Sequence, residues 1–269
     1  LNGCVRLQFY ARGALSNLFL EPQPALLESQ PAVKDAVLYV RAVGLNFRDV
    51  LNLLGEYPGD PGPPGSDSAG VIASVGPAVH LAKGSAIVGN AHAPLASAAR
   101  ASASLLAPKP ALLSFEESAT LPTTWCTSHI ALAYQSLQVG AKLLTNAAAG
   151  GVGLKAIEYA LWLRADVSGT CGRPHKHRQL HSLGLVQRCG SRDAVAFAHG
   201  TTRALRGNRL AAVLNSLSGD FISGSFAALC EVGCFAEIGK RSIWSALRHA
   251  ALTQRIRYVA IALDIDMAH

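Results

Sequence analysis

The spacing of apolar residues changes near the middle of the chain. Before about residue 118, short apolar runs such as 37–43 and 69–76 alternate with turn residues, and a loop rich in Pro and Gly occupies 57–65. This pattern predicts a compact, mostly β lobe. From residue 119 onward, apolar stretches of strand period and of helical period alternate along the chain. Strands that alternate with helices predict a parallel, doubly wound sheet.

The expected organisation is therefore a small lobe at 1–118 followed by an α/β lobe at 119–269. In the second lobe we expect strands at 142–146, 166–170, 211–215, 233–238 and 257–263, and helices at 127–137, 153–163, 175–183 and 222–229. A chain of 269 residues, half of them hydrophobic, suits two lobes and is too short for three full domains.

A glycine turn joins the first strand of the second lobe to its helix. Gly151-Val-Gly153-Leu-Lys-Ala156 has the form GxGxxA. In a dinucleotide-binding turn of this kind the first glycine allows the tight turn, the second lets the backbone approach the phosphates, and the alanine packs helix against strand. The phosphates bind at the helix N-terminus, where free N–H groups and the helix dipole favour negative charge.

Composition limits the setting of the protein. No apolar run approaches the roughly 20 residues that span a bilayer, and the N-terminus lacks a signal-peptide pattern, so we expect a cytoplasmic protein without membrane segments. Six scattered cysteines predict reduced thiols rather than a metal site or disulfides. The chain opens on Leu1 and contains a single methionine, Met267, which suggests a piece of a longer polypeptide.

The positive charge is concentrated in one segment. Residues 173–209 hold eight Lys or Arg against the single acid Asp193, and eight minus one equals the net charge of +7 of the whole chain. A nucleic-acid surface is a poor interpretation because Phe197 is the only aromatic residue there that could stack on a base. The position of the segment, directly after the second strand of a nucleotide fold, favours a cofactor that carries phosphate.

The same segment favours NADPH over NADH. NAD-binding folds usually place an acid about 20 residues after the glycine turn for the ribose 2′-hydroxyl, whereas a nearby arginine accepts the 2′-phosphate of NADP. Here 169–172 reads Gly-Thr-Cys-Gly without an acid, and Arg173, Lys176 and Arg178 follow. Cations beside a phosphate form charge-assisted contacts. Lys176 is the preferred contact and Arg173 the next.

Several motifs in order resemble the enoyl reductase domains of polyketide synthases, within the medium-chain dehydrogenase/reductase superfamily. They are VRAVGLNFRDVL at 40–51, YPG at 57–59, SFEESATLP at 114–122, AAAGGVG at 147–153, VLNSLSG at 213–219 and FAEIGK at 235–240. The resemblance covers essentially the whole chain. It implies that the first lobe is a GroES-like substrate lobe and the second an NADPH-binding Rossmann lobe.

The resemblance also implies an activity. Such domains reduce an α,β-enoyl thioester, carried on the phosphopantetheine of an acyl carrier protein, to the saturated acyl chain with NADPH. Matching positions make Tyr57 and Lys240 candidate proton donors. The family carboxylate corresponds roughly to Asp264, with Ala262 as the alternative occupant of that position. The implied cofactor site consists of Asn46, Thr127, Ala149, Gly150, Gly151, Val152, Gly153, Thr170, Arg173, Lys176, Asn215, Ser216 and Gly239. Neighbouring synthase domains would belong to the same polypeptide, and a homodimer is one assembly to consider.

Some positions depart from the motifs of this family, and others have two possible interpretations. Asn146 stands before the glycine turn where a His is common, and the early end at His269 predicts an incomplete substrate cleft. Arg48 and Asp49 could border the nicotinamide pocket or form a structural ion pair. No metal is expected, because the position of the GHExxG zinc motif reads GSDSAG at 65–70, without a His or Cys ligand.

Three other functions remain alternatives at this level. The first is a free-standing NADPH-dependent quinone or enone oxidoreductase of the same superfamily. The second is a degenerate, non-catalytic reductase lobe kept as a structural unit of a megasynthase. The third, a basic nucleic-acid-binding module, is the weakest, because it depends on the cationic segment alone.

Overall fold

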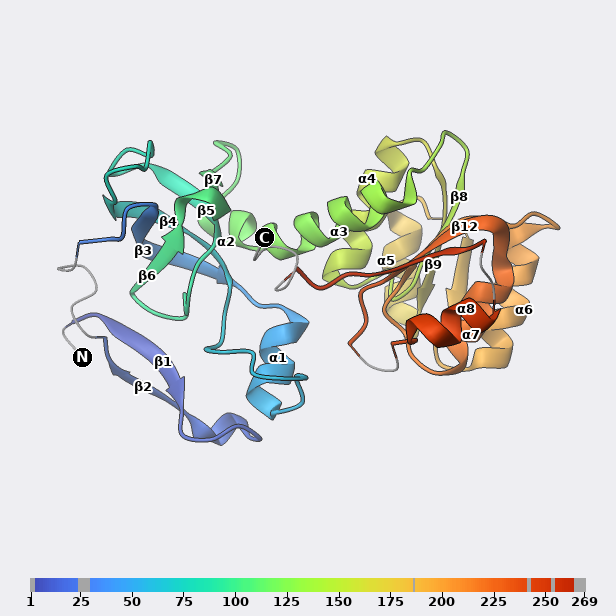
Figure 1. The fold of residues 1–269 in the computed structure, drawn as a ribbon, viewed down its shortest axis with the longest axis horizontal. Helices are drawn as coiled ribbons and strands as arrows, with labels where there is room; N and C mark the ends of the chain where they lie inside the picture. Colours follow the sequence, from blue (N-terminus) through green and yellow to red (C-terminus); the bar gives the residue numbers. More distant parts are fainter. Residues whose placement is uncertain (1–2, 24–29, 186, 241–242, 253–254, 264–269) are drawn as a thin grey trace. The chain divides into compact units, whose positions relative to one another are not determined.

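The computed structural model describes residues 3–23, 30–185, 187–240, 243–252 and 255–263 (Figure 1). The chain divides into two compact units, Leu1–Thr123 and Thr124–His269. The sequence places the change at 118/119, and the structure places it at 123/124. Helix α2 (Phe115–Ala119) packs against strands of the first unit, which accounts for the later boundary.

The first unit is built on antiparallel strands. A hairpin pairs β1 (Val5–Phe9) with β2 (Leu18–Pro22), and a five-stranded sheet has the order β6-β3-β4-β5-β7. The sheet strands are β3 (Asp35–Gly44), β4 (Asp67–Val75), β5 (Ala86–Asn90), β6 (Ala98–Ser102) and β7 (Leu106–Pro108). Helix α1 (Phe47–Leu54) follows β3. Leu38, Ile72 and Ile87 are at most 1% exposed and form the centre of the core of this unit.

The second unit is a parallel sheet of six strands in the order β10-β9-β8-β11-β12-β13 (Figure 1). The strands are β8 (Lys142–Thr145), β9 (Asp166–Cys171), β10 (Gln187–Gly190), β11 (Leu210–Asn215), β12 (Leu229–Glu237) and β13 (Arg257–Ala260). The helices are α3 (Pro122–Gln135), α4 (Gly151–Trp162), α5 (Pro174–Ser182), α6 (Ala194–Leu205), α7 (Asp220–Ala228) and α8 (Ala246–Leu252). No helix of the described ranges is long and apolar enough to cross a membrane.

Two hydrophobic clusters show that the sheet is covered on both faces. Leu143 of β8 belongs to a cluster with residues of α3, α4 and α5, whereas the next residue, Leu144, belongs to a cluster with residues of α6 and α7. Adjacent strand residues point to opposite faces. The predicted α/β fold with a doubly wound parallel sheet is therefore confirmed.

Three elements of the second unit and one boundary differ from the sequence interpretation. Strand β10 and helices α6 and α8 were not predicted. Strand β10 reads QRCG and lacks the apolar run of a buried parallel strand, and helix α6 is rich in Ala and Thr. The last strand ends at Ala260 rather than at residue 263.

Candidate functional site

The predicted dinucleotide turn lies at the carboxyl end of β8, in the middle of the parallel sheet. Helix α4 begins at Gly151 with Gly150 as its N-cap, and no side chain caps this end. The N–H groups of the first helical turn have no partner within a helix. Ligands of open parallel sheets bind at the carboxyl ends of the strands. This helix end is therefore a suitable seat for a pyrophosphate.

The sequence motif explains Gly153 by the close approach of the backbone to the phosphates. The structure shows another reason, which is that there is no room for a side chain at this position. A Cβ there would lie 2.6 Å from the carbonyl oxygen of Ala147 and 2.7 Å from backbone atoms of Ala148. The helix thus packs closely on the loop that precedes it, so the glycine is required by the protein itself. The role of Ala156 in helix packing agrees with its complete burial in the core.

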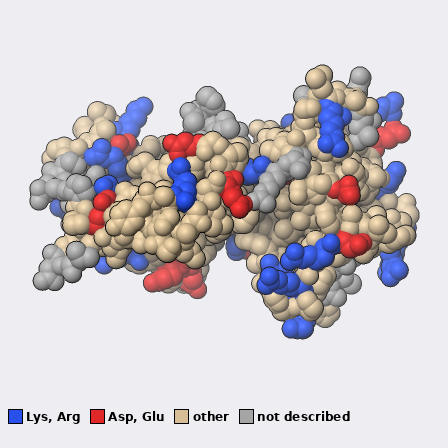
Figure 2. Space-filling model, turned by 90° about the horizontal axis from the view of Figure 1, so that it is seen from below, with Lys and Arg blue, Asp and Glu red and all other residues tan. Residues whose placement is uncertain are grey.

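Cations gather at the carboxyl end of β9, the next strand of the sheet. Arg173 is the N-cap of α5, and Lys176 lies in the first turn of that helix. Arg192 was not singled out by sequence, yet its Nε lies 2.5 Å from where a Cβ of Gly172 would be. Most of α5 and strand β10 lie in the chain between Arg192 and the other two cations. Because β10 pairs with β9, Arg192 nevertheless lies at this edge of the sheet. Figure 2 shows Lys and Arg at many places on one face of the molecule, several of them close together near the lower margin of the view.

A buried chain of hydrogen bonds crosses four neighbouring strands at the same edge. Thr170 of β9 donates from Oγ1 to Oδ1 of Asn146 (3.1 Å), and Nδ2 of Asn146 donates to Oδ1 of Asn215 in β11 (2.8 Å). Nδ2 of Asn215 then donates to Oε2 of Glu237 in β12 (2.6 Å). All four side chains are at most 3% exposed. Asn146, which departs from the family pattern, is a central member of this chain.

Two predicted cofactor residues act inside this chain. The Asn215 side chain also donates to the carbonyl oxygen of Leu217 and accepts from its N–H, so both polar groups of the amide are engaged within the protein. Thr170 Oγ1 accepts from the N–H of Ala147 (3.1 Å). The side chains of both residues therefore shape the loops after β8 and β11.

Glu237 is the residue that sequence reasoning missed. Its carboxylate is 1% exposed and accepts a second hydrogen bond, from the N–H of Gly239 to Oε1 (2.6 Å). Burial raises the pKa of this carboxyl to about 7, although the bonds from Asn215 and Gly239 lower it. The glutamate lies inside the FAEIGK motif, where an acid within an apolar strand is the signal that could have found it.

The remaining predicted residues of this unit lie on the same edge of the sheet or beside α4. Lys240 and Gly239 follow the carboxyl end of β12, and Ser216 follows that of β11. Thr127 is buried in α3, and the hydroxyl of its neighbour Ser128 lies 3.2 Å from the carbonyl oxygen of Val152 in the first turn of α4. Ala149 lies in the turn before α4. Asp264 lies outside the described residues.

In the first unit, Asn46 is the N-cap of α1 and is used structurally. Its Nδ2 donates to Oδ2 of Asp67 (3.0 Å), and its backbone N–H donates to Oδ2 of Asp49 (2.8 Å). Asp49 also accepts from the N–H of Gly65 (2.9 Å). Arg48 instead donates to the carbonyl oxygen of Pro61 (2.7 Å). Arg48 and Asp49 have separate partners, so the ion-pair interpretation is wrong.

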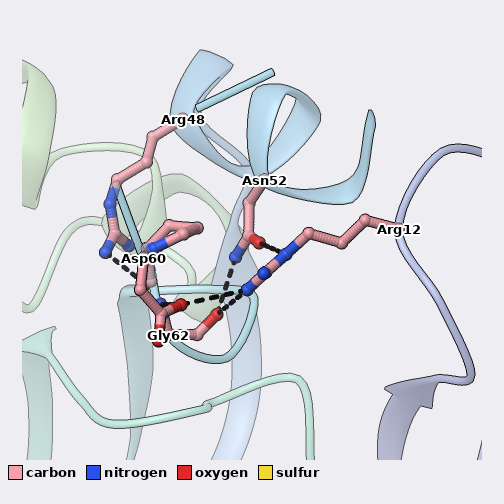
Figure 3. A network of polar contacts seen from close by, with 6 residues as sticks. Arg12, Arg48, Asn52, Asp60 and Gly62 are labelled. Atoms are coloured by element: carbon pink, nitrogen blue, oxygen red, sulfur yellow. Dashed lines mark hydrogen bonds and ion pairs between the residues drawn. The ribbon is translucent and has the colours of Figure 1, made fainter. Parts of the chain in front are cut away.

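Arg12 and residues of α1 hold in place the loop at 60–62, which follows Tyr57 in the chain (Figure 3). Asn52, which is fully buried, donates from Nδ2 to the carbonyl oxygen of Gly62 (3.0 Å) and accepts from Nε of Arg12 (3.0 Å). Arg12 also donates to Oδ1 of Asp60 (3.2 Å). The Arg48 guanidinium carbon lies 5.5 Å from the centre of the Tyr57 ring. Tyr57 itself is half-buried.

The acid in the GSDSAG segment has a structural role. Asp67 is 1% exposed and accepts from the side chains of Asn46, Asn90 and Thr123. Burial raises the pKa of this carboxyl, and these hydrogen bonds lower it. Within the described ranges, no group of three or more His, Cys, Asp or Glu could hold a metal ion.

The sequence and structure are similar to known reductases. Residues 33–128 match the alcohol dehydrogenase GroES-like domain family. The chain is 36% identical over 237 residues to erythronolide synthase EryA2 of Saccharopolyspora erythraea, a match that covers 87% of this chain. It is 35% identical over 263 residues to the pikromycin polyketide synthase component PikAII of Streptomyces venezuelae, a match that covers 96% of this chain. It spans only 7% of the length of each of these two synthases.

Solved structures of enoyl reductases are similar over nearly the whole of this chain. The crystal structure of CurK enoyl reductase superposes with a TM-score of 0.92 at 32% identity, covering 99% of this chain and 83% of that one. JamJ enoyl reductase gives 0.91 at 29% identity, with 99% and 83% covered. A mycobacterial protein determined in complex with NADPH gives 0.85 at 25% identity, with 96% and 82% covered.

Proposed function

The chain belongs to the enoyl reductases of polyketide synthases, in the medium-chain dehydrogenase/reductase superfamily, and on this premise we propose that it reduces an α,β-enoyl thioester with NADPH. The observation that carries the proposal is the uncapped N-terminus of α4 beside the cations that follow β9. One feature suits a pyrophosphate, and the other suits the additional phosphate of NADPH.

The chain's own residues divide the work of holding the cofactor. Backbone N–H groups of the first turn of α4 would hold the pyrophosphate, since free N–H groups and the helix dipole favour anions there. Lys176, Arg173 and Arg192 would hold the 2′-phosphate, to which each cation would add a charge-assisted contact. Bound NADPH supplies a hydride for the β-carbon of the enoyl group. Thr170 and Asn215 keep the flanking loops in position through the buried hydrogen-bond chain.

Tyr57 and Lys240 are the two candidates to supply the proton that the α-carbon needs. Tyr57 holds a proton at its Oη, and the neighbouring Arg48 guanidinium stabilises the negative charge left on the ring when that proton leaves. Lys240 holds a proton at Nζ after the carboxyl end of β12. Asp264 remains a third predicted member, by resemblance alone.

The substrate class and the partners follow from the relatives. Both synthases are long polypeptides of which this chain matches a small part. We propose that neighbouring synthase domains share the polypeptide, that an acyl carrier protein presents the enoyl thioester on phosphopantetheine, and that the reaction takes place in the cytoplasm.

Turnover of a carrier mimic tests the proposal. The protein is mixed with NADPH and crotonyl-pantetheine, and the loss of NADPH absorbance is followed beside a reaction with a small quinone. Faster oxidation with the thioester supports the proposal. Oxidation with the quinone alone would instead make the protein a quinone reductase, and NADPH binding without oxidation of either would make it a non-catalytic lobe. Tyr57→Phe and Lys240→Met, assayed for kcat and for NADPH affinity, then distinguish the proton donors.

A further inference from the structure

The buried hydrogen-bond chain has a direction, and it ends on a charge. Each donor in the series Thr170, Asn146, Asn215 points toward the next strand, and the last acceptor is the Glu237 carboxylate. Its other oxygen accepts from the N–H of Gly239. A carboxylate is acceptor-only when ionised, and both of its oxygens face donors. The arrangement therefore fits the ionised form of the side chain.

This negative charge has no ion-pair partner among the residues that the structure describes. The side chain is 1% exposed, so water does not screen it either. Asn215 is the neighbour from β11 and is uncharged. Tyr258 of β13 interacts with this charge. Burial is the main cause that raises the pKa of its phenol, and the charge of Glu237 raises it further. Lys240 follows three positions later in the chain. A buried, uncompensated charge is costly and therefore calls for an explanation.

We propose that the Glu237 carboxylate tunes the bound nicotinamide, by stabilising the positively charged oxidised ring more than the neutral reduced ring. The inference rests on the proposed function. Glu237 is the last residue of β12, and its two hydrogen-bond donors, Asn215 and Gly239, lie at the same carboxyl edge of the sheet, where ligands of open parallel sheets bind. A negative charge directly behind this edge makes NADPH a better hydride donor, because the charge of the oxidised ring is balanced when the hydride has left.

Relative affinity for the two forms of the cofactor measures this effect. NADPH and NADP⁺ share the pyrophosphate and the 2′-phosphate, so a purely structural defect weakens both equally. Only the charge distinguishes them. If Glu237 lies within about 10 Å of the ring, its charge at the effective dielectric of a protein site changes the ratio of the two dissociation constants roughly tenfold or more.

The experiment compares four proteins at about pH 8, where Glu237 is largely ionised. NADPH binding is followed by its fluorescence and NADP⁺ binding by displacement. Glu237→Gln is expected to weaken NADP⁺ relative to NADPH by about tenfold. Glu237→Asp keeps the charge and is expected to keep the wild-type ratio, even if both affinities fall. Glu231→Gln is the control, because Glu231 lies exposed on the same strand and pairs with Arg255.

The wild-type protein gives a second measurement that does not depend on how the variants fold. Because the pKa of Glu237 lies at about 7, the preference for NADP⁺ should weaken between about pH 8 and about pH 6 as the carboxyl is protonated. The Tyr258 phenol, with its pKa raised above 10.0, does not titrate in this interval. An equal loss for both nucleotides in Glu237→Gln, or a ratio independent of pH, would overturn the inference alone. If the wild-type protein binds neither nucleotide, the proposed function falls as well.

Discussion

Raising the pH should destabilise the second unit through one side chain, Glu237. Burial raises the pKa of this carboxyl from 4.5 to about 7 in the folded protein. The folded state thus holds the proton more tightly than the unfolded chain. The contribution of Glu237 to stability is therefore complete below pH 4.5 and is lost as the pH rises through about 7.

The magnitude follows from the same interval. From 4.5 to about 7, at about 1.4 kcal/mol per pH unit, the loss in the free energy of unfolding is on the order of 3 kcal/mol. The side chain is 1% exposed, so the figure needs no reduction for solvent screening. This is a large share of the roughly 5–15 kcal/mol that stabilises a typical domain.

Tryptophan fluorescence during urea unfolding is a suitable assay. All three tryptophans, Trp125, Trp162 and Trp244, belong to the second unit, so the signal reports on the unit that holds Glu237. Wild type and Glu237→Gln are unfolded without cofactor at about pH 5 and about pH 8. Because the other titrating groups are common to both proteins, the difference between their free energies of unfolding isolates this carboxyl.

Between these two pH values, Glu237→Gln should gain about 2.5 kcal/mol relative to wild type, because the unfolded carboxyl is already largely ionised at about pH 5; a constant offset from the altered hydrogen bond to Gly239 does not change this difference. Two parallel pH dependences would refute the reasoning, since they would mean that Glu237 keeps an ordinary pKa on folding.

Four further changes test other parts of the structure. Lys176→Ala should weaken NADPH binding by at least tenfold more than NADH binding, measured by fluorescence titration, because only NADPH carries the 2′-phosphate. Gly153→Ala should abolish NADPH binding and cost about 1–3 kcal/mol of stability in urea unfolding, since its Cβ would lie 2.6 Å from the carbonyl oxygen of Ala147. Asn52→Ala should lower kcat for the enoyl thioester and leave NADPH affinity unchanged, because it releases the loop that follows Tyr57. In alkylation followed by mass spectrometry, exposed Cys126 should react before Cys189, whose thiol pKa burial raises.

Matched controls accompany these changes. Arg203→Ala removes an exposed cation of the same basic segment, and an equal effect on NADPH would contradict the role of Lys176. Gly151→Ala should be milder than Gly153→Ala, since its Cβ would meet only Thr124 Cγ2, at 3.0 Å. For Asn52, a loss of NADPH affinity equal to the loss of kcat would point to general unfolding. Rapid alkylation of Cys189 would show that α6 opens readily.

Local sequence chemistry was enough to predict the glycine turn and the cations that follow the next strand. A glycine turn between an apolar strand and an amphipathic helix, and cations directly after the next strand, are features of consecutive residues. The turn does begin a helix at Gly151, and Arg173 and Lys176 do lie at the start of α5. These features were predictable because they depend on spacing within a few turns of the chain.

The spacing of residues along the chain did not predict side-chain partners, helix α6 or the place of Arg192. Thr170 and Asn215 are polar residues at strand ends. The neighbouring sequence does not show that Thr170 bonds to the N–H of Ala147 and Asn215 to the side chain of Asn146, rather than either residue to a ligand. Helix α6 lacked a clear apolar period, since its buried residues Phe197, Thr201 and Leu205 include a polar one. Arg192 was visible only as one cation among eight.

The sequence by itself determined the alternation of strands and helices, the glycine turn and the side of the sheet where cations follow the strands. Only the tertiary structure decided which strands are neighbours, with β8 between β9 and β11. This order joins Asn146 to Asn215, 69 residues away, and leads the buried hydrogen-bond chain to Glu237. The physical reason is that the pKa of a carboxyl depends on its burial and on the donors around it, and both come from residues distant in sequence.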